Sequence, residues 1–211
     1  MSESTISRRA RNDSAKDLRR QHILDCAEKI VLHKGLSQLS ITAVAKEAKL
    51  AIGTIYLYFE NKEELIAQLT LKSREILLQK FREGIALSPH PLEQIRNILV
   101  ASQNFYQENK FYHELVSFFE INAGLAETPE LKEAGLAITH LVVSVLENAK
   151  KQGLIRPETD EKAFALIMWA TSVGMIQLLD VKEAMVRELL PGKGQDFYNH
   201  YVDILLRGIM S

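Results

Sequence analysis

The sequence has 211 residues, 46% of them hydrophobic and 25% charged, which excludes disordered, fibrous and disulfide-rich proteins and allows one domain or two small ones. Cys26 is the single cysteine, so an internal disulfide is excluded and a reducing compartment is favoured. The formal net charge of −1 argues by itself against a nucleic-acid partner, but it is a sum that conceals an uneven distribution along the chain.

The N-terminus is polar and contains no apolar run, which excludes a secretory signal peptide and predicts a cytoplasmic protein. Residues 1–16 predict a flexible basic arm, which either enters a DNA minor groove or remains a solvated tail. The basic side chains of the arm and of the residues that follow it are Arg8, Arg9, Arg11, Lys16, Arg19 and Arg20.

Apolar residues recur at helical spacing after the arm and predict a first helix over residues 17–34, which ends before Gly35. Ser40 is placed to cap a short second helix that extends to Ala48. The segment at 52–59 follows too closely to pack antiparallel to it. Together they predict a helix, a tight turn and a second helix.

A longer helix is predicted from Asn61 to about Ser88, where Pro89 ends it. Further helices are predicted near residues 91–108, 110–124, 129–152, 160–180 and 195–210, and no segment alternates as a strand would. The fold class is therefore all-α, with an N-terminal three-helix domain and a C-terminal helical bundle. The uncharged run at 163–179 contains polar residues, which favours a helix buried on most sides over a membrane span.

Catalytic and metal motifs are missing from the sequence. The Gly192-Lys193-Gly194 segment lacks the third glycine of a dinucleotide loop, and Ser117 stands where a zinc protease would have its second histidine. We therefore predict no enzyme activity, no cofactor and no metal. A helical enzyme without a local motif remains an alternative.

Residues 40–59, SITAVAKEAKLAIGTIYLYF, followed by ENKEEL, resemble the helix-turn-helix of the tetracycline-repressor (TetR) family of bacterial regulators. The residues that match in register are Val44, Ala45, Gly53, Thr54, Ile55, Tyr56, Phe59, Lys62 and Leu65. Three positions depart from the family pattern, since Lys49, Ala51 and Tyr58 stand where the family has Gly, Ser and His.

The resemblance implies a helix-turn-helix DNA-binding domain over residues 17–62, with its motif at 40–59, and an effector-binding and dimerisation domain over 63–211. It implies phosphate contacts from Ser40, Thr42, Tyr58 and Lys62, and a recognition helix that Ala51 opens and whose base-facing residues are Ile52, Gly53, Thr54 and Tyr56. For Ile55 and Phe59 we predict burial in the core. Packing in the core remains an alternative for Tyr56 and Tyr58.

The charge distribution agrees with this division. Residues 1–62 contain 11 Lys and Arg against 7 Asp and Glu, a net +4, whereas the remainder contains 15 against 20, a net −5. A basic N-terminal segment is attracted to the phosphates of a DNA duplex. The total of −1 therefore does not exclude a DNA partner.

The predicted ligand site and the predicted dimer interface both lie in the C-terminal half. We predict an effector pocket for a lipophilic or aromatic molecule, lined by Phe105, Phe118, Phe119, His140, Trp169 and Gln177. The last helix has an apolar stripe, which with residues 163–179 predicts a homodimer interface, an intrachain core being the alternative. Its members are Phe197, Tyr201, Ile204, Leu205 and Gly208.

The sequence therefore predicts a transcriptional regulator that binds specific DNA sequences, namely a repressor that a small molecule releases from a palindromic operator. The alternative is a ligand-binding or protein-interaction adaptor of the same fold that no longer binds DNA.

Overall fold

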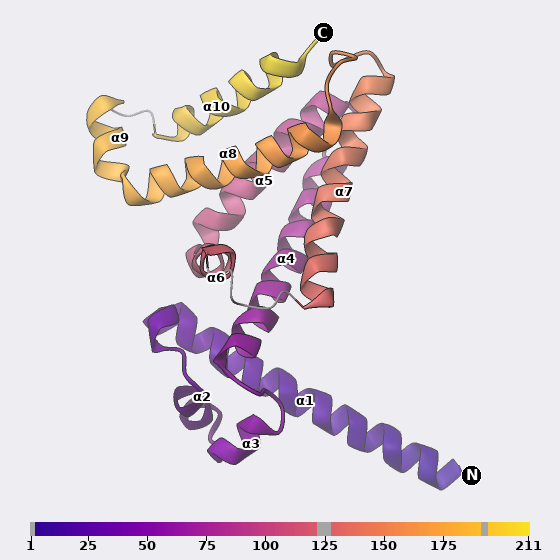
Figure 1. The fold of residues 1–211 in the computed structure, drawn as a ribbon, viewed down its shortest axis with the longest axis vertical. Coiled ribbons are helices and arrows are strands. Elements are labelled where there is room, and N and C mark those ends of the chain that lie inside the picture. The colour runs from indigo at the N-terminus through magenta and orange to yellow at the C-terminus, as the bar shows by residue number, and fades with distance from the viewer. Residues whose placement is uncertain (1–2, 122–127, 191–193) are drawn as a thin grey trace. The chain divides into compact units, whose positions relative to one another are not determined.

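The computed structural model of the chain describes residues 3–121, 128–190 and 194–211, and over these residues the predicted all-α class is confirmed (Figure 1). In the described ranges, β pairing is limited to an isolated bridge between Ile155 and Met210. The helices are α1 (Glu3–Lys34), α2 (Ile41–Ala48), α3 (Ile52–Tyr56), α4 (Lys62–Ala86), α5 (Pro91–Glu108), α6 (Lys110–Ile121), α7 (Pro129–Lys151), α8 (Glu161–Val181), α9 (Glu183–Leu189) and α10 (Gly194–Ile209), with a 3-10 turn at Leu36–Gln38.

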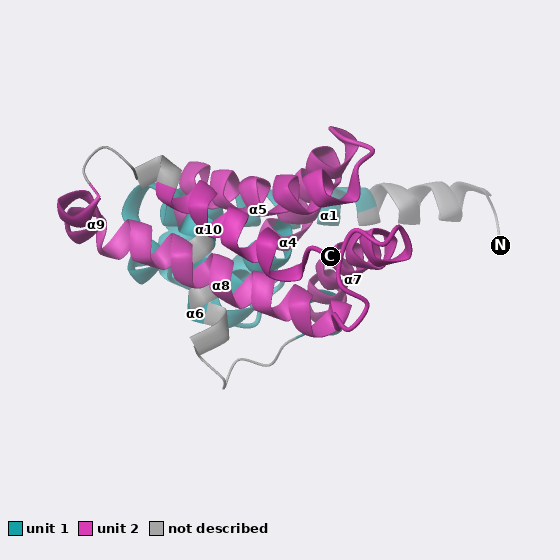
Figure 2. Cartoon of the chain, turned by 90° about the horizontal axis from the view of Figure 1, so that it is seen from above, with its two compact units in different colours: residues 1–72, 111–131 teal, residues 73–110, 132–211 magenta. Residues whose placement is uncertain are grey.

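The chain forms two compact units (Figure 2). Unit 1 comprises Met1–Lys72 and Phe111–Leu131, and unit 2 comprises Ser73–Lys110 and Lys132–Ser211. Helix α4 therefore begins in unit 1 and continues into unit 2, and the chain returns to unit 1 where α6 begins. A division at residue 62 does not anticipate that residues 111–131 belong with the N-terminal helices.

Two helices differ from the prediction. Helix α1 begins at Glu3, so it extends over the residues for which we expected a flexible arm. No Gly or Pro interrupts these residues, and Ala and Arg favour a helix. Helix α9 was not predicted, because its seven residues are too few to establish a helical period and only Val186 among them is buried.

The core of unit 1 brings the helix-turn-helix against α1. Helix α1 contributes the fully buried Ile23 and Ala27, and α2 contributes Val44. Ile55 of α3 and Phe59 after it are also fully buried, which confirms the core positions predicted for them. The motif is thus held by its apolar side, and its other side is available for binding.

Unit 2 packs α5, α8 and α10 together (Figure 1). The hydroxyl of the buried Tyr198 donates a hydrogen bond of 2.9 Å to the carbonyl of Leu99, and the Tyr201 hydroxyl lies 2.8 Å from Thr171 Oγ1 and 3.0 Å from Ser172 Oγ. Burial raises the pKa of both tyrosines above the ordinary value, so they remain neutral hydrogen-bonding groups at physiological pH.

Helix α8 is buried on one side only, so the prediction that it is buried on most sides is wrong for the single chain. The helix buries five residues, Phe164, Ala165, Met168, Ser172 and Ile176. Leu166, Ile167 and Trp169 are exposed. By length and composition alone, the helix is long and apolar enough to cross a membrane. Of the 18 consecutive residues that are most apolar, 22% are buried.

The turn between α2 and α3 contains a strained residue. Lys49 has φ 55° and ψ 43°, the left-handed helical conformation, and among the described residues it is the single non-glycine with positive φ. Its backbone N–H donates to Lys46 and that of Leu50 donates to Ala45, which closes the C-terminus of α2. A side chain in this conformation costs roughly 1 kcal/mol relative to glycine.

We expect Lys49→Gly to raise the free energy of unfolding of unit 1 by about 1 kcal/mol, because glycine adopts positive φ without strain. Denaturant unfolding monitored by circular dichroism measures this change. Lys46→Gly removes the same charge from within α2 and should instead lower the free energy of unfolding by a similar amount. A lower free energy of unfolding for Lys49→Gly than for wild type would contradict the conclusion that Lys49 is strained.

Candidate nucleic-acid interface

The helix-turn-helix is built by one cap and one buried face. Ser40 is extended, and its hydroxyl accepts a hydrogen bond of 3.1 Å from the backbone N–H of Ala43, as predicted for the cap of α2. Ala51, at the corresponding position of α3, makes no side-chain cap bond. Helix α3 has only five residues, so it depends on the burial of Ile55 to hold it in place.

The residues predicted to face DNA bases lie mostly on the open side of α3. Ala51, Ile52, Gly53 and Tyr56 are exposed, whereas Thr54 is half-buried. A Cβ atom added to Gly53 would meet nothing within 4 Å, so packing inside the chain does not require glycine there. The absence of a side chain leaves room for another molecule to approach the backbone.

The residues predicted to contact phosphate lie at the start of α2 and after α3. Ser40 and Thr42 are exposed, and Tyr58 and Lys62 are half-buried. All nine predicted DNA-binding residues therefore belong to unit 1 and have side chains or backbone at least partly accessible. Their DNA-binding roles stay predictions.

Leu57 is an accessible residue of this segment that the sequence did not reveal. It ends α3, its side chain is 76% exposed, and its backbone N–H donates to Thr54 and Ile55. Periodicity assigns apolar residues to the core by default, so an outward leucine between two tyrosines gives no distinctive signal.

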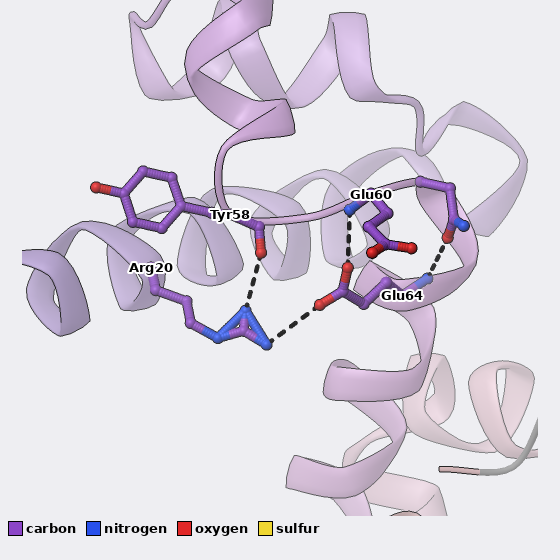
Figure 3. Close-up of polar contacts among 5 residues, drawn as sticks. Arg20, Tyr58, Glu60 and Glu64 are labelled. Atoms are coloured by element: carbon purple, nitrogen blue, oxygen red, sulfur yellow. Dashed lines mark hydrogen bonds and ion pairs between the residues drawn. The ribbon is translucent and has the colours of Figure 1, made fainter.

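Arg20 fastens α1 to the segment that links α3 with α4 (Figure 3). Its guanidinium carbon lies 4.3 Å from the centre of the Phe59 ring, Nη1 donates to the Tyr58 carbonyl at 3.4 Å, and Nη2 lies 3.5 Å from Glu64 Oε1. The sequence predicts Arg20 as one of the basic side chains available to DNA beside the arm, but the structure engages it within the protein. It therefore helps to position Tyr58 and the start of α4.

The start of α4 is capped from both sides. Asn61 Oδ1 accepts a hydrogen bond of 2.8 Å from the Glu64 backbone N–H, and Glu64 Oε2 accepts one of 2.8 Å from the Glu60 backbone N–H (Figure 3). The first bond satisfies an N–H group that a helix end leaves unpaired, and the second joins Glu60, which precedes the helix, to its first turn. They fix the backbone around Lys62, the predicted phosphate contact.

A second polar cluster joins three helices of unit 1. The Tyr112 hydroxyl of α6 donates a hydrogen bond of 2.6 Å to Glu28 Oε1 of α1, and Lys72 Nζ of α4 lies 2.5 Å from Glu28 Oε2. Burial raises the pKa of Tyr112 well above its usual range, and the hydrogen bond to Glu28 and the charge of that carboxylate add to the shift. Helix α6 is thereby bonded to the helices that support the motif.

The predicted pocket residues are distributed over both units. Phe105 is buried in unit 2, where its ring packs edge-on against Tyr106 at 5.2 Å, and Phe118 is half-buried in unit 1. His140, Trp169 and Gln177 are exposed, and the side chain of Phe119 lies outside the described residues. The pocket lining stays a prediction. Within the described ranges, no group of three or more His, Cys, Asp or Glu could hold a metal ion.

Comparisons with known proteins find one family profile and relatives that are transcriptional regulators of the helix-turn-helix type. Residues 23–69 match the profile described as bacterial regulatory proteins, tetR family. An uncharacterized HTH-type transcriptional regulator of Haemophilus influenzae is 32% identical over 54% of this chain, and the chain spans only 62% of that relative's length. The HTH-type transcriptional regulator UidR of Escherichia coli is 23% identical over 78% of this chain and 83% of its own.

Solved structures share the fold. A protein of unknown function from Rhodococcus sp. RHA1 has a TM-score of 0.78 and 22% identity, and the match covers 92% of this chain and 96% of that one. The transcriptional regulator FadR of Bacillus subtilis, in complex with stearoyl-CoA, has a TM-score of 0.71 and 19% identity, with 90% and 98% covered.

We expect Tyr112→Phe to lower the free energy of unfolding by about 1–2 kcal/mol at neutral pH, because a buried hydrogen bond to a carboxylate is lost. The raised pKa of Tyr112 means that this stabilisation is complete below pH 10 and is lost at higher pH. The difference in the free energy of unfolding between wild type and Tyr112→Phe should therefore become smaller above pH 10. Tyr56→Phe removes an exposed hydroxyl and should change stability by less than about 0.5 kcal/mol. Denaturant unfolding at several pH values tests both variants. A difference between wild type and Tyr112→Phe that grows above pH 10 would contradict the stabilising role of the Tyr112–Glu28 hydrogen bond.

Proposed function

Because the chain belongs to the TetR family of bacterial regulatory proteins, we propose that it is a cytoplasmic homodimeric repressor that binds a palindromic DNA operator and is released by a small-molecule effector. The observation that carries the proposal is the outward side of α3, where Ile52, Gly53 and Tyr56 are accessible and no packing contact among the described residues explains Gly53.

In the proposed complex, α3 enters the major groove and the flanking residues hold the duplex backbone. Ser40 and Thr42 at the start of α2, with Tyr58 and Lys62 after α3, contact phosphates. The net charge of +4 over residues 1–62 supports the approach of this unit to DNA. The fastening of Arg20 and the caps of α4 support a fixed geometry for these contacts.

The exposed side of α8 supports the homodimer. Leu166, Ile167 and Trp169 are accessible in the single chain, and Ile204 and Gly208 of α10 are accessible in the same unit. A helix this apolar and this exposed requires a partner. A second copy supplies one, and two copies present two recognition helices to the two halves of a palindrome.

The connections between the units support control by an effector. Helix α4 is continuous from unit 1 to unit 2, and within unit 1 the Lys72 ammonium of α4 is paired with Glu28 of α1. An effector that binds better to one arrangement of the helices shifts the population towards it and changes the affinity for DNA. The stearoyl-CoA bound to the Bacillus subtilis regulator supports a lipophilic effector.

Selection from a random duplex pool tests the proposal. The full chain should retain duplexes in gel shift at low salt, and repeated selection should converge on a palindrome. Addition of a verified effector should weaken binding to that palindrome. Failure to bind any duplex would favour the adaptor, which retains the fold without the DNA activity.

We expect Lys62→Ala to weaken binding to all duplexes alike and to lower the slope of log K against log salt by about 1, because one phosphate contact is lost. Thr54→Ala should instead change which sequences are preferred. Lys132→Ala removes an exposed charge from α7 and serves as control. DNA-binding titrations at several salt concentrations give the slope for each variant. A slope in Lys62→Ala equal to that of wild type would count against a phosphate contact by Lys62.

We expect Ile167→Glu to convert the dimer to a monomer, because it places a charge in the proposed α8 interface. Leu136→Glu is the matched control, since Leu136 of α7 is 46% exposed and Ile167 is 48% exposed. Sedimentation velocity at micromolar concentration reports the state of each variant. A wild-type monomer under these conditions would refute the dimer.

A further inference from the structure

The recognition segment lacks the side chains that usually identify bases by paired hydrogen bonds. Residues 51–58 are Ala-Ile-Gly-Thr-Ile-Tyr-Leu-Tyr, with no Arg, Lys, Asn, Gln, Asp or Glu among them. Arg and Lys recognise guanine and Asn and Gln recognise adenine, whereas Glu and Asp accept from cytosine. The hydroxyls of Thr54, Tyr56 and Tyr58 donate and accept, so they distinguish bases only weakly.

The segment instead presents a group of large apolar side chains to solvent. Leu57 is 76% exposed, Tyr56 is 54% exposed and Ile52 is 45% exposed. The core does not need them, because Ile55 and Phe59 fill it and are fully buried. The backbone N–H of Leu57 is bonded to the end of α3, which fixes where its side chain projects.

Charge around the segment favours a duplex as the occupant of this apolar surface. Lys46 and Lys49 are exposed on the two sides of the α2 C-terminus, and the carboxylate of Glu47 is paired with Lys29 at 2.5 Å. Lys46 and Lys49, which precede the apolar segment in the chain, are therefore exposed for contact with phosphates. An apolar surface preceded in the chain by cations matches the major groove, where the thymine C5-methyl group is the apolar feature that base pairs display.

We propose that this protein recognises its DNA through thymine methyl groups, with Ile52, Tyr56 and Leu57 as the side chains that contact them. The proposal rests on the proposed function, because it requires that α3 enter the major groove. Leu57 then becomes a specificity residue, and T·A pairs occupy the positions of each half-site that α3 covers. Gly53 allows the backbone to come close enough for these side chains to reach the methyl groups.

Replacement of thymidine by deoxyuridine tests the proposal, since deoxyuridine pairs identically and lacks only the C5-methyl group. The full chain is titrated with its selected duplex and with the same duplex containing deoxyuridine in the half-sites. Affinity should fall about fourfold for each methyl group that a side chain covers, the factor for one buried methylene at 0.8 kcal/mol. Placing 5-methylcytosine at a position mutated from T·A to C·G should recover part of the affinity.

Leu57→Ala connects the effect to the side chain. It should reduce the ratio of the thymidine and deoxyuridine affinities by about fourfold for a single covered methyl group. Leu87→Ala is the matched control, because Leu87 is 79% exposed between α4 and α5 and should leave the ratio unchanged. Thermal unfolding should be the same for both variants, since neither leucine is part of the core.

The outcomes separate the two proposals. Equal affinity for the thymidine and deoxyuridine duplexes, or an unchanged ratio in both Leu57→Ala and Ile52→Ala, would overturn methyl recognition while the DNA-binding function stood. A selected half-site without thymine under α3 would overturn it as well. Failure to bind any duplex at low salt would refute the DNA-binding function and, with it, methyl recognition.

Discussion

The burial of Ile55 and Phe59 is the constraint on which the exposed surface of α3 depends. A helix of five residues has too few hydrogen bonds to be stable alone, so α3 exists because these two side chains enter the core of unit 1. Arg20 reinforces the arrangement, because its guanidinium stacks on Phe59 and donates a hydrogen bond to the Tyr58 carbonyl. Each outward residue of α3 therefore has its position set by an inward one, which is how a short element can present a fixed surface to a ligand.

The same unit is completed by a segment that is distant in sequence. Glu28 receives a hydrogen bond from Tyr112 and an ion pair from Lys72, so α1, α4 and α6 share one carboxylate. A partly buried carboxylate is costly without such partners, and loss of either donor weakens the connection between helices rather than a single contact. A displacement of α6 or α4 therefore acts on α1, against which the helix-turn-helix packs.

Local signals explain which features could be predicted. Helical periodicity, the Ser40 cap and the prolines near residue 90 act within a few residues, so most helices and the motif were recognised from the sequence. Arg20 with Tyr58, and Glu28 with Tyr112, join residues 38 and 84 positions apart, and no local pattern encodes such pairs. The outward direction of Leu57 was missed for a related reason, since an apolar residue has the same signature whether its partner belongs to the core or to another molecule.

The open side of α8 has a consequence for gene control that extends beyond architecture. When dimers are the species that binds DNA and the chain is mostly monomeric, dimer concentration rises with the square of the total chain concentration. A twofold change in synthesis then gives about a fourfold change in the binding species. In the proposed dimer, the strength of the contact made by the exposed Leu166, Ile167 and Trp169 therefore sets the range of cellular abundance over which the regulator responds steeply.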